Sequence, residues 1–200
     1  MSKLLGWHSG CDGPSVLMPI EVVPLWEGTE LPSNGRTVEA EFRWSGQTQA
    51  TDYDRACDAS SHSHGELFPF GSAAAYVPDS GQQIAVFESS DPTQQFLLEL
   101  WASDEDESDD ALLQRALQSI SEPTSWHILG NMECQSGEIW VFHAADTGTD
   151  ILEDEGANIE TPFSFILNPG TYQLLYADWP NPKWPEGKNG LIWLRKEENS

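Results

Sequence analysis

The sequence YVPDSGQQIAVF, residues 76–87, places a turn-forming tetrapeptide between two runs of β-prone residues. Proline, aspartate and glycine supply the backbone geometry of a tight turn, so this pattern predicts an antiparallel hairpin. Residues 96–101 are mostly apolar and predict a further strand. Upstream, residues 15–26 are apolar but punctuated by prolines, which favours edge strands or extended chain. These segments indicate a fold dominated by antiparallel β-structure.

A similar pattern recurs downstream. Residues 137–146, like residues 81–91, join a turn glycine to a β-prone run and a small acidic loop. We interpret residues 1–200 as a single domain with two similar β-rich halves, residues 1–102 and 122–197. Because the match is short, a chance similarity between two hairpins is an alternative interpretation.

A helix is predicted between the two halves, at residues 103–121. Ser103 is a candidate N-cap, and apolar residues between Leu112 and Ile120 fall at helical spacing. The first turns are strongly acidic, which suits the positive end of the helix dipole. The acids are Asp104, Glu105, Asp106, Glu107, Asp109 and Asp110. The predicted fold class is therefore α+β, predominantly antiparallel β, with two similar β-rich halves joined by an acidic helix.

Negative charge dominates the composition. Asp and Glu number 33 against nine Lys and Arg, which gives a formal net charge of −24. Between Arg55 and Lys183 the only basic side chain is Arg115. Such a surface repels nucleic acid and anionic membranes and attracts cationic proteins. We therefore expect a protein partner with a basic surface, without direct binding to nucleic acid or membrane. Simple solubility is the alternative explanation of the charge.

The compartment is predicted from what the sequence lacks. Its first residues do not form the long apolar segment of a secretory signal, and no later apolar run is long enough to cross a bilayer. The three cysteines, Cys11, Cys57 and Cys134, are too few and too scattered for a disulfide framework. These features predict a cytoplasmic protein with reduced thiols.

The most distinctive short motif is DYDRACD, residues 52–58. A nucleophilic Cys57 would need a cationic neighbour and a positioned base, but three aspartates oppose the charge of Arg55. The nearest histidines, His62 and His64, lie in a Ser-rich segment. An acid–arginine network that pins a loop explains the same residues with fewer requirements. We expect no catalytic residue and no enzyme activity, and a small Cys/His hydrolase is an alternative class.

Metal and cofactor motifs are weak. His62 and His64 flank one residue, but the sequence contains neither CxxC nor HExxH. Residues 104–110 lack the central glycine and distal glutamate of an EF-hand loop. There is also no P-loop and no GxGxxG motif. We therefore expect no metal and no cofactor.

Two motifs precede the aspartate-rich run DYDRAC at 52–57. The first is Gly6-Trp7 with Gly13-Pro14, and the second is Trp26 with Gly28. Together the three resemble the Immunity protein 21 family, predicted antidotes encoded beside bacterial polymorphic toxins. Fainter similarity continues through residues 86–92, 141–146 and 169–172. Cys11-Asp12 departs from the small residue and glycine expected there, and the acidic segment is longer and more charged than usual. The motif residues are Trp7, Gly13, Pro14, Trp26, Gly28, Asp52, Tyr53, Asp54, Arg55 and Cys57.

The resemblance implies an immunity protein, or antitoxin, that binds and neutralises a cognate bacterial toxin. The charge favours a nuclease toxin, because nucleases present basic clefts to nucleic acid. The side chains expected to contact the toxin are the acids of residues 104–110 with Glu153, Asp154 and Glu155. An acidic nucleic-acid mimic that inhibits a DNA-binding protein is an alternative function.

Overall fold

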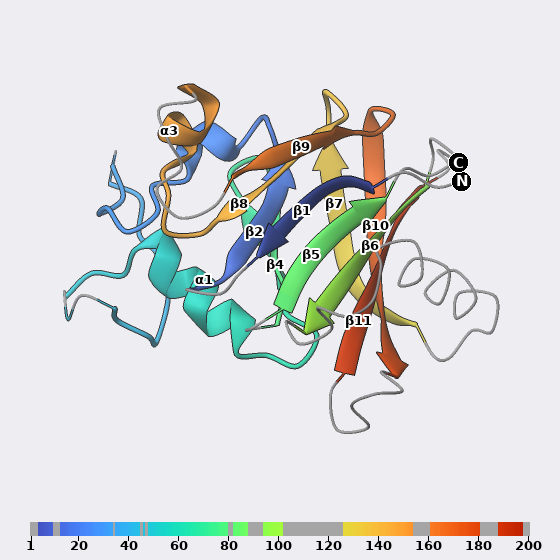
Figure 1. The fold of residues 1–200 in the computed structure, drawn as a ribbon. Helices are drawn as coiled ribbons and strands as arrows, with labels where there is room; N and C mark the ends of the chain where they lie inside the picture. Colours follow the sequence, from blue (N-terminus) through green and yellow to red (C-terminus); the bar gives the residue numbers. More distant parts are fainter. Residues whose placement is uncertain are drawn as a thin grey trace.

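The computed structural model describes residues 4–9, 13–33, 35–44, 46, 48–79, 82–87, 94–101, 126–153, 161–180 and 188–197. Within these residues the chain forms two antiparallel β-sheets with a few short helices beside them (Figure 1). The predicted fold, predominantly antiparallel β with few helices, is confirmed at this level. The predicted acidic helix at 103–121 lies outside the described residues.

The larger sheet has six strands in the described part of the chain. In spatial order they are β1 (Leu4–Ser9), β5 (Gln82–Phe87), β6 (Gln94–Trp101), β11 (Lys188–Lys196), β10 (Gly170–Pro180) and β7 (His127–Cys134). The smaller sheet has five described strands: β3 (Glu66–Phe70), β4 (Ala73–Val77), β2 (Ser15–Pro19), β8 (Glu138–His143) and β9 (Phe163–Ile166).

The two sheets pack face to face around one hydrophobic core. The smaller sheet contributes Leu17 and Tyr76, and the larger sheet contributes Ile84, Tyr172 and further apolar side chains. Burial of each large apolar side chain stabilises the fold by roughly 1.5–3 kcal/mol. The alternating direction of side chains along a strand places the neighbours of Leu17 on the opposite face of the smaller sheet.

That opposite face is covered by a third layer. Val16 and Met18 face it, and they pack in a second core with residues of three helical elements. These elements are the 3-10 helix η1 (Val23–Leu25), α1 (Asp52–Ser60) and α3 (Gly148–Glu153). The smaller sheet is therefore buried on both faces. This explains why residues 15–19 are all buried and show no polar alternation.

Two local predictions were wrong. Residues 15–19 are not an edge strand, because β2 lies between β4 and β8; Pro19 is tolerated at the last position of the strand. The hairpin predicted at 76–87 does not form, because β4 and β5 belong to different sheets. Tyr76 and Ile84 both face the core between the sheets, and local turn chemistry does not distinguish this crossing from a hairpin.

The strand order bears on the predicted halves. The larger sheet reads β1-β5-β6 and then β11-β10-β7, and the smaller sheet pairs β4-β2 with β8-β9. Each sheet thus contains strands from both halves. Apart from β3, the order is symmetrical if β1 is matched with β7, β5 with β10 and β2 with β8. The sequence match between residues 81–91 and 137–146 pairs β5 with β8, which lie in different sheets. The two-half organisation stays a prediction, with a different correspondence of strands.

Candidate functional site: an aspartate-pinned loop

The DYDRAC motif forms helix α1, which begins after a complete capping box. The Thr51 hydroxyl accepts a hydrogen bond from the Asp54 N–H at 3.2 Å. The Asp54 carboxylate in turn accepts from the Thr51 N–H at 2.8 Å. This reciprocal arrangement satisfies backbone donors that a helix leaves open at its amino end. The sequence contains this signal as Thr51-Asp52-Tyr53-Asp54, with Asp in place of the usual Glu or Gln.

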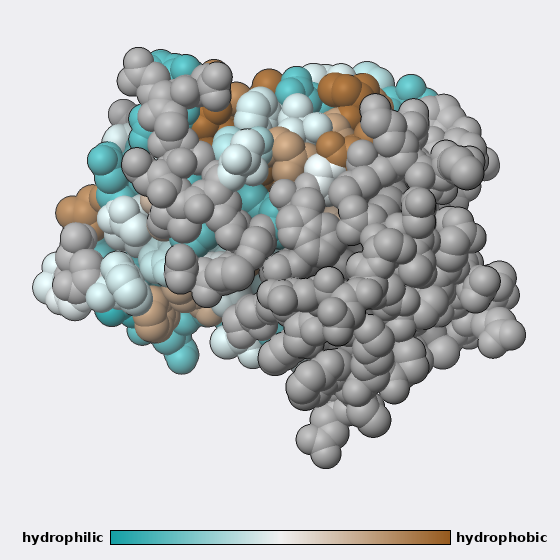
Figure 2. Space-filling model, viewed as in Figure 1, coloured by the Kyte–Doolittle hydropathy of each residue, from teal (hydrophilic) through white to brown (hydrophobic). Residues whose placement is uncertain are grey.

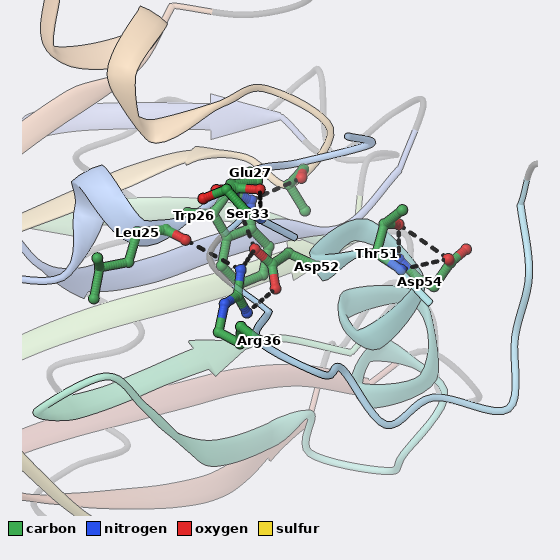
Figure 3. Close-up of polar contacts among 9 residues, drawn as sticks. Leu25, Trp26, Glu27, Ser33, Arg36, Thr51, Asp52 and Asp54 are labelled. Atoms are coloured by element: carbon green, nitrogen blue, oxygen red, sulfur yellow. Dashed lines mark hydrogen bonds and ion pairs between the residues drawn. The ribbon is translucent and has the colours of Figure 1, made fainter. Parts of the chain in front are cut away.

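Asp52 anchors the first part of the preceding loop to the helix. Its carboxylate pairs with both terminal nitrogens of Arg36, each at 2.6 Å, and accepts from the Glu27 N–H at 2.9 Å. Arg36 also donates to the Leu25 carbonyl at 3.2 Å, and its guanidinium lies over the Phe70 ring. Figure 3 shows Arg36 reaching from the loop to the end of the helix. Hydrogen bonding to Asp52 raises the pKa of Arg36, so the guanidinium stays charged.

Two further aspartates of α1 hold the second part of the loop. Asp54 accepts a hydrogen bond from the Trp44 N–H at 2.6 Å. Asp58 accepts from the backbone N–H groups of Glu41 and Phe42. Residues 27–50 contain no helix or strand among their described positions. We call them the pinned loop, because three aspartates of a single helix anchor them mainly through backbone donors.

The remaining motif residues stabilise α1 against the smaller sheet. Arg55 forms a bidentate ion pair with Glu66, at 2.9 and 2.6 Å, and lies over the Phe68 ring. Burial, with the charges of Asp54 and Asp58, raises the pKa of Cys57 to about 11, although a hydrogen bond with Tyr53 opposes this. At neutral pH the thiol is protonated and a poor nucleophile. The aspartates of the motif thus hold the loop, through Arg36 and backbone donors, whereas Arg55 of the motif pairs with Glu66 of the sheet.

Pro14, Trp26 and Gly28, from the other motifs, meet at the end of β8. The indole N–H of the buried Trp26 donates to the Ala144 carbonyl at 2.9 Å, and the Ala144 N–H donates to the Pro14 carbonyl at 2.9 Å. Gly28 has a φ of +54°, and a Cβ there would meet the Ala145 carbonyl. Three separate segments of sequence thus converge on one short stretch of backbone.

The same region holds a buried polar cluster that sequence reasoning missed. His8 and His143 are each about 1% exposed, and the His8 Nδ1 lies 2.8 Å from the Ser15 hydroxyl. Tyr53 stacks on His143 with ring centroids 6.3 Å apart. Burial, with the nearby His143, lowers the pKa of His8 to about 4. A Cβ on Gly13 would lie 2.8 Å from the Tyr53 hydroxyl and 2.9 Å from His143 Nε2, so this glycine allows the cluster to close.

The pinned loop also presents large side chains at the surface. Trp44 is 66% exposed and Phe42 is 40% exposed, although the backbone of both is held by aspartates. The Trp44 ring contacts Tyr53 edge-on, with centroids 5.8 Å apart. Figure 2 shows that the described surface on the side of α1 and the pinned loop is mainly hydrophilic, with separate hydrophobic patches. The exposed acids of the loop are Glu30, Glu39 and Glu41.

Most of the acids predicted to contact a partner lie outside the described residues. These are Asp104, Glu105, Asp106, Glu107, Asp109, Asp110, Asp154 and Glu155. Glu153 is described, and it is exposed at the end of α3. The Trp7 side chain is also not described, although its backbone pairs with Ala85 in the larger sheet.

The two histidines considered as metal ligands have structural contacts. His62 lies 3.2 Å from the Glu66 carboxylate, and His64 packs against the rings of Tyr176 and His127. Among the described residues, no group of three or more His, Cys, Asp or Glu side chains is arranged to hold a metal ion.

Comparison with known proteins gives no assignment: no family model, curated protein or solved structure matches this chain significantly. No described helix is both long enough and apolar enough to span a membrane.

Proposed function

We propose that this protein is an immunity protein that binds a cognate bacterial toxin with a basic surface and neutralises it stoichiometrically. The observation that carries the proposal is the pinned loop, which combines a fixed backbone with an exposed Trp44. Tryptophan is enriched among the residues that dominate binding energy at protein interfaces. A loop that is already ordered loses little conformational entropy on binding, which favours affinity.

The charge around these aromatic residues supports the basic character of the partner. Glu39 and Glu41 precede Phe42 along the loop, and both are exposed. With a net charge of −24, the whole chain attracts a cationic protein and accelerates its association. The acids of residues 104–110 and 153–155 belong to the same proposal as a second contact region. A nuclease fits this chemistry, because its cleft is basic in order to bind nucleic acid.

The test is a binding measurement with the product of the neighbouring gene. Calorimetry in 50 mM and 300 mM salt should give a one-to-one complex that weakens as salt rises, by screening of the acidic surface. The variant W44A should lose at least about 10-fold in affinity while unfolding like the wild type. The matched control is I166A, which removes another side chain that is 71% exposed, from β9.

The outcomes separate the parts of the proposal. Absence of a complex would refute the toxin partner. Equal losses in W44A and I166A would exclude the pinned loop as the binding site, and salt-independent affinity would exclude the electrostatic contribution. Tight binding to a DNA-binding protein, in place of the neighbouring gene product, would favour the nucleic-acid mimic.

A further inference from the structure

The pinned loop lines a pocket of about 300 Å³, which lies between residues 32–38 and residues 43–50. This volume is at the lower end of the range for small-molecule sites. Arg36 and Arg43 line it, together with the polar side chains of Thr37, Thr48 and Gln49. The pocket is therefore built from the segment that α1 anchors, and it lies beside the exposed Phe42 and Trp44 in sequence.

The charge of the pocket is opposite to that of the protein. Acidic residues outnumber basic ones by 33 to nine in the chain. Even so, the described lining contains two arginines and neither aspartate nor glutamate. Such a local reversal of sign marks the pocket as a place where a negative group is stabilised against the field of the surrounding surface.

Arg43 carries the uncompensated charge. Arg36 is already paired with Asp52 through both terminal nitrogens. In the described part of the chain, Arg43 donates only through Nη1, to the carbonyls of Ala40 and Phe42, and it pairs with no carboxylate. Bonding through Nη1 leaves the edge formed by Nε and Nη2 for another acceptor. That edge matches the two oxygens of a carboxylate.

We propose that this pocket binds a carboxylate group, with Arg43 as its charged partner and Thr37, Thr48 and Gln49 completing the hydrogen bonds. A carboxylate is favoured over a phosphate, because the field of a protein with a net charge of −24 opposes a doubly charged ligand more strongly than a singly charged one. The carboxylate belongs either to a small molecule or to an acidic residue of a bound protein. This site does not depend on the proposed toxin partner.

The direct test is an NMR titration of the whole chain with acetate and succinate, at constant ionic strength. We expect saturable shifts of the Arg43 Nε–H signal and of backbone amides in residues 36–50. The variant R43Q should weaken binding by about 10-fold or more, because it removes a charged hydrogen-bonding partner. Inorganic phosphate, which carries more than one negative charge at pH 7 on average, should bind more weakly than the singly charged acetate.

A matched control removes the same charge elsewhere. R195Q alters an exposed arginine on β11 that contacts Gln173 and Trp193, and it should leave carboxylate affinity within about 2-fold of the wild type. A second variant, Q49E, introduces a carboxylate at the pocket without touching Arg43 and should also weaken binding. Unsaturable shifts, or equal affinity of R43Q and R195Q, would overturn the site. Tighter binding of phosphate would overturn the carboxylate preference.

A competition arm distinguishes the two sources of the carboxylate. If an acidic residue of the neighbouring gene product occupies the pocket, succinate competes with the complex, and R43Q weakens that complex more than R195Q does. If the natural ligand is a small molecule, both variants bind the protein partner equally while R43Q alone loses succinate.

Discussion

Replacing Asp52 by Asn tests whether the carboxylate of α1 holds the pinned loop in place. Asp52 is 2% exposed, whereas Arg36 is 34% exposed. The carboxylate accepts two charge-assisted hydrogen bonds and one from the Glu27 N–H. Asparagine has a similar shape, but it replaces one acceptor oxygen with a donor and removes the negative charge.

The magnitude follows from these contacts. A hydrogen bond to a charged group contributes about 1.5–3 kcal/mol, and leaving a buried charge without its partner costs about 3–5 kcal/mol. Because water reaches one side of Arg36, the lower part of these ranges applies. We expect D52N to reduce the free energy of unfolding by about 2–3 kcal/mol.

The assay is urea denaturation at pH 7, followed by circular dichroism and tryptophan fluorescence. D150N is the matched control, because Asp150 is exposed in the first turn of α3 and should change stability by about 0.5 kcal/mol or less. A double-mutant cycle with R36Q should give a coupling energy of about 1–2 kcal/mol. Strictly additive effects, or a D52N variant as stable as D150N, would refute the structural role of the pair.

Three further predictions concern the buried cluster and the end of β8. The pKa of His8 is about 4 in the folded protein, below the ordinary value of 6.5 that applies to the unfolded chain. As pH falls, the unfolded chain therefore binds the proton first, and the folded state keeps its full stability only above pH 6.5. As pH falls toward 4 we expect a loss of up to about 3 kcal/mol, measured by urea denaturation from pH 7.5 to 4.5 and reduced in H8Q. The pKa of Cys57 is about 11, so iodoacetamide should alkylate it slowly at pH 7 and faster as pH approaches 10, and C57S should retain partner binding. G28A should cost at least about 2 kcal/mol, because its φ of +54° and the Ala145 carbonyl oppose a side chain; a thermal melt within 2 °C of the wild type would contradict this.

The fold class was predictable because strand periodicity and turn residues are local signals. The hairpin error at 76–87 arises from a non-local property. Whether β5 returns beside β4 or crosses to the other sheet depends on which strands compete for pairing, and β5 pairs instead with β1 and β6. The same holds for β2, whose central position results from pairing with β8, more than a hundred residues away in sequence.

The candidate site was also predictable only in its local features. An acid–arginine network was predictable from DYDRAC, because carboxylates and an arginine that are close in sequence usually form ion pairs. The identity of the partners was not, because Arg36 and Glu66 belong to separate segments that only the fold brings to α1. The buried histidine cluster joins His8 to His143 across two sheets, and neither histidine has a local pattern that marks it.

In the pinned loop, the residues that hold the backbone differ from the side chains that are exposed for binding. Asp54 and Asp58 bind backbone N–H groups of Trp44, Glu41 and Phe42, so these hydrogen bonds do not depend on which side chains the loop carries. Trp26, Asp52 and Asp54 are buried, and their hydrogen bonds fix the backbone around them. On the proposed function, such a motif defines how the loop is presented, whereas the exposed side chains between residues 39 and 44 define what it binds. A shared motif therefore predicts a shared scaffold more strongly than a shared partner.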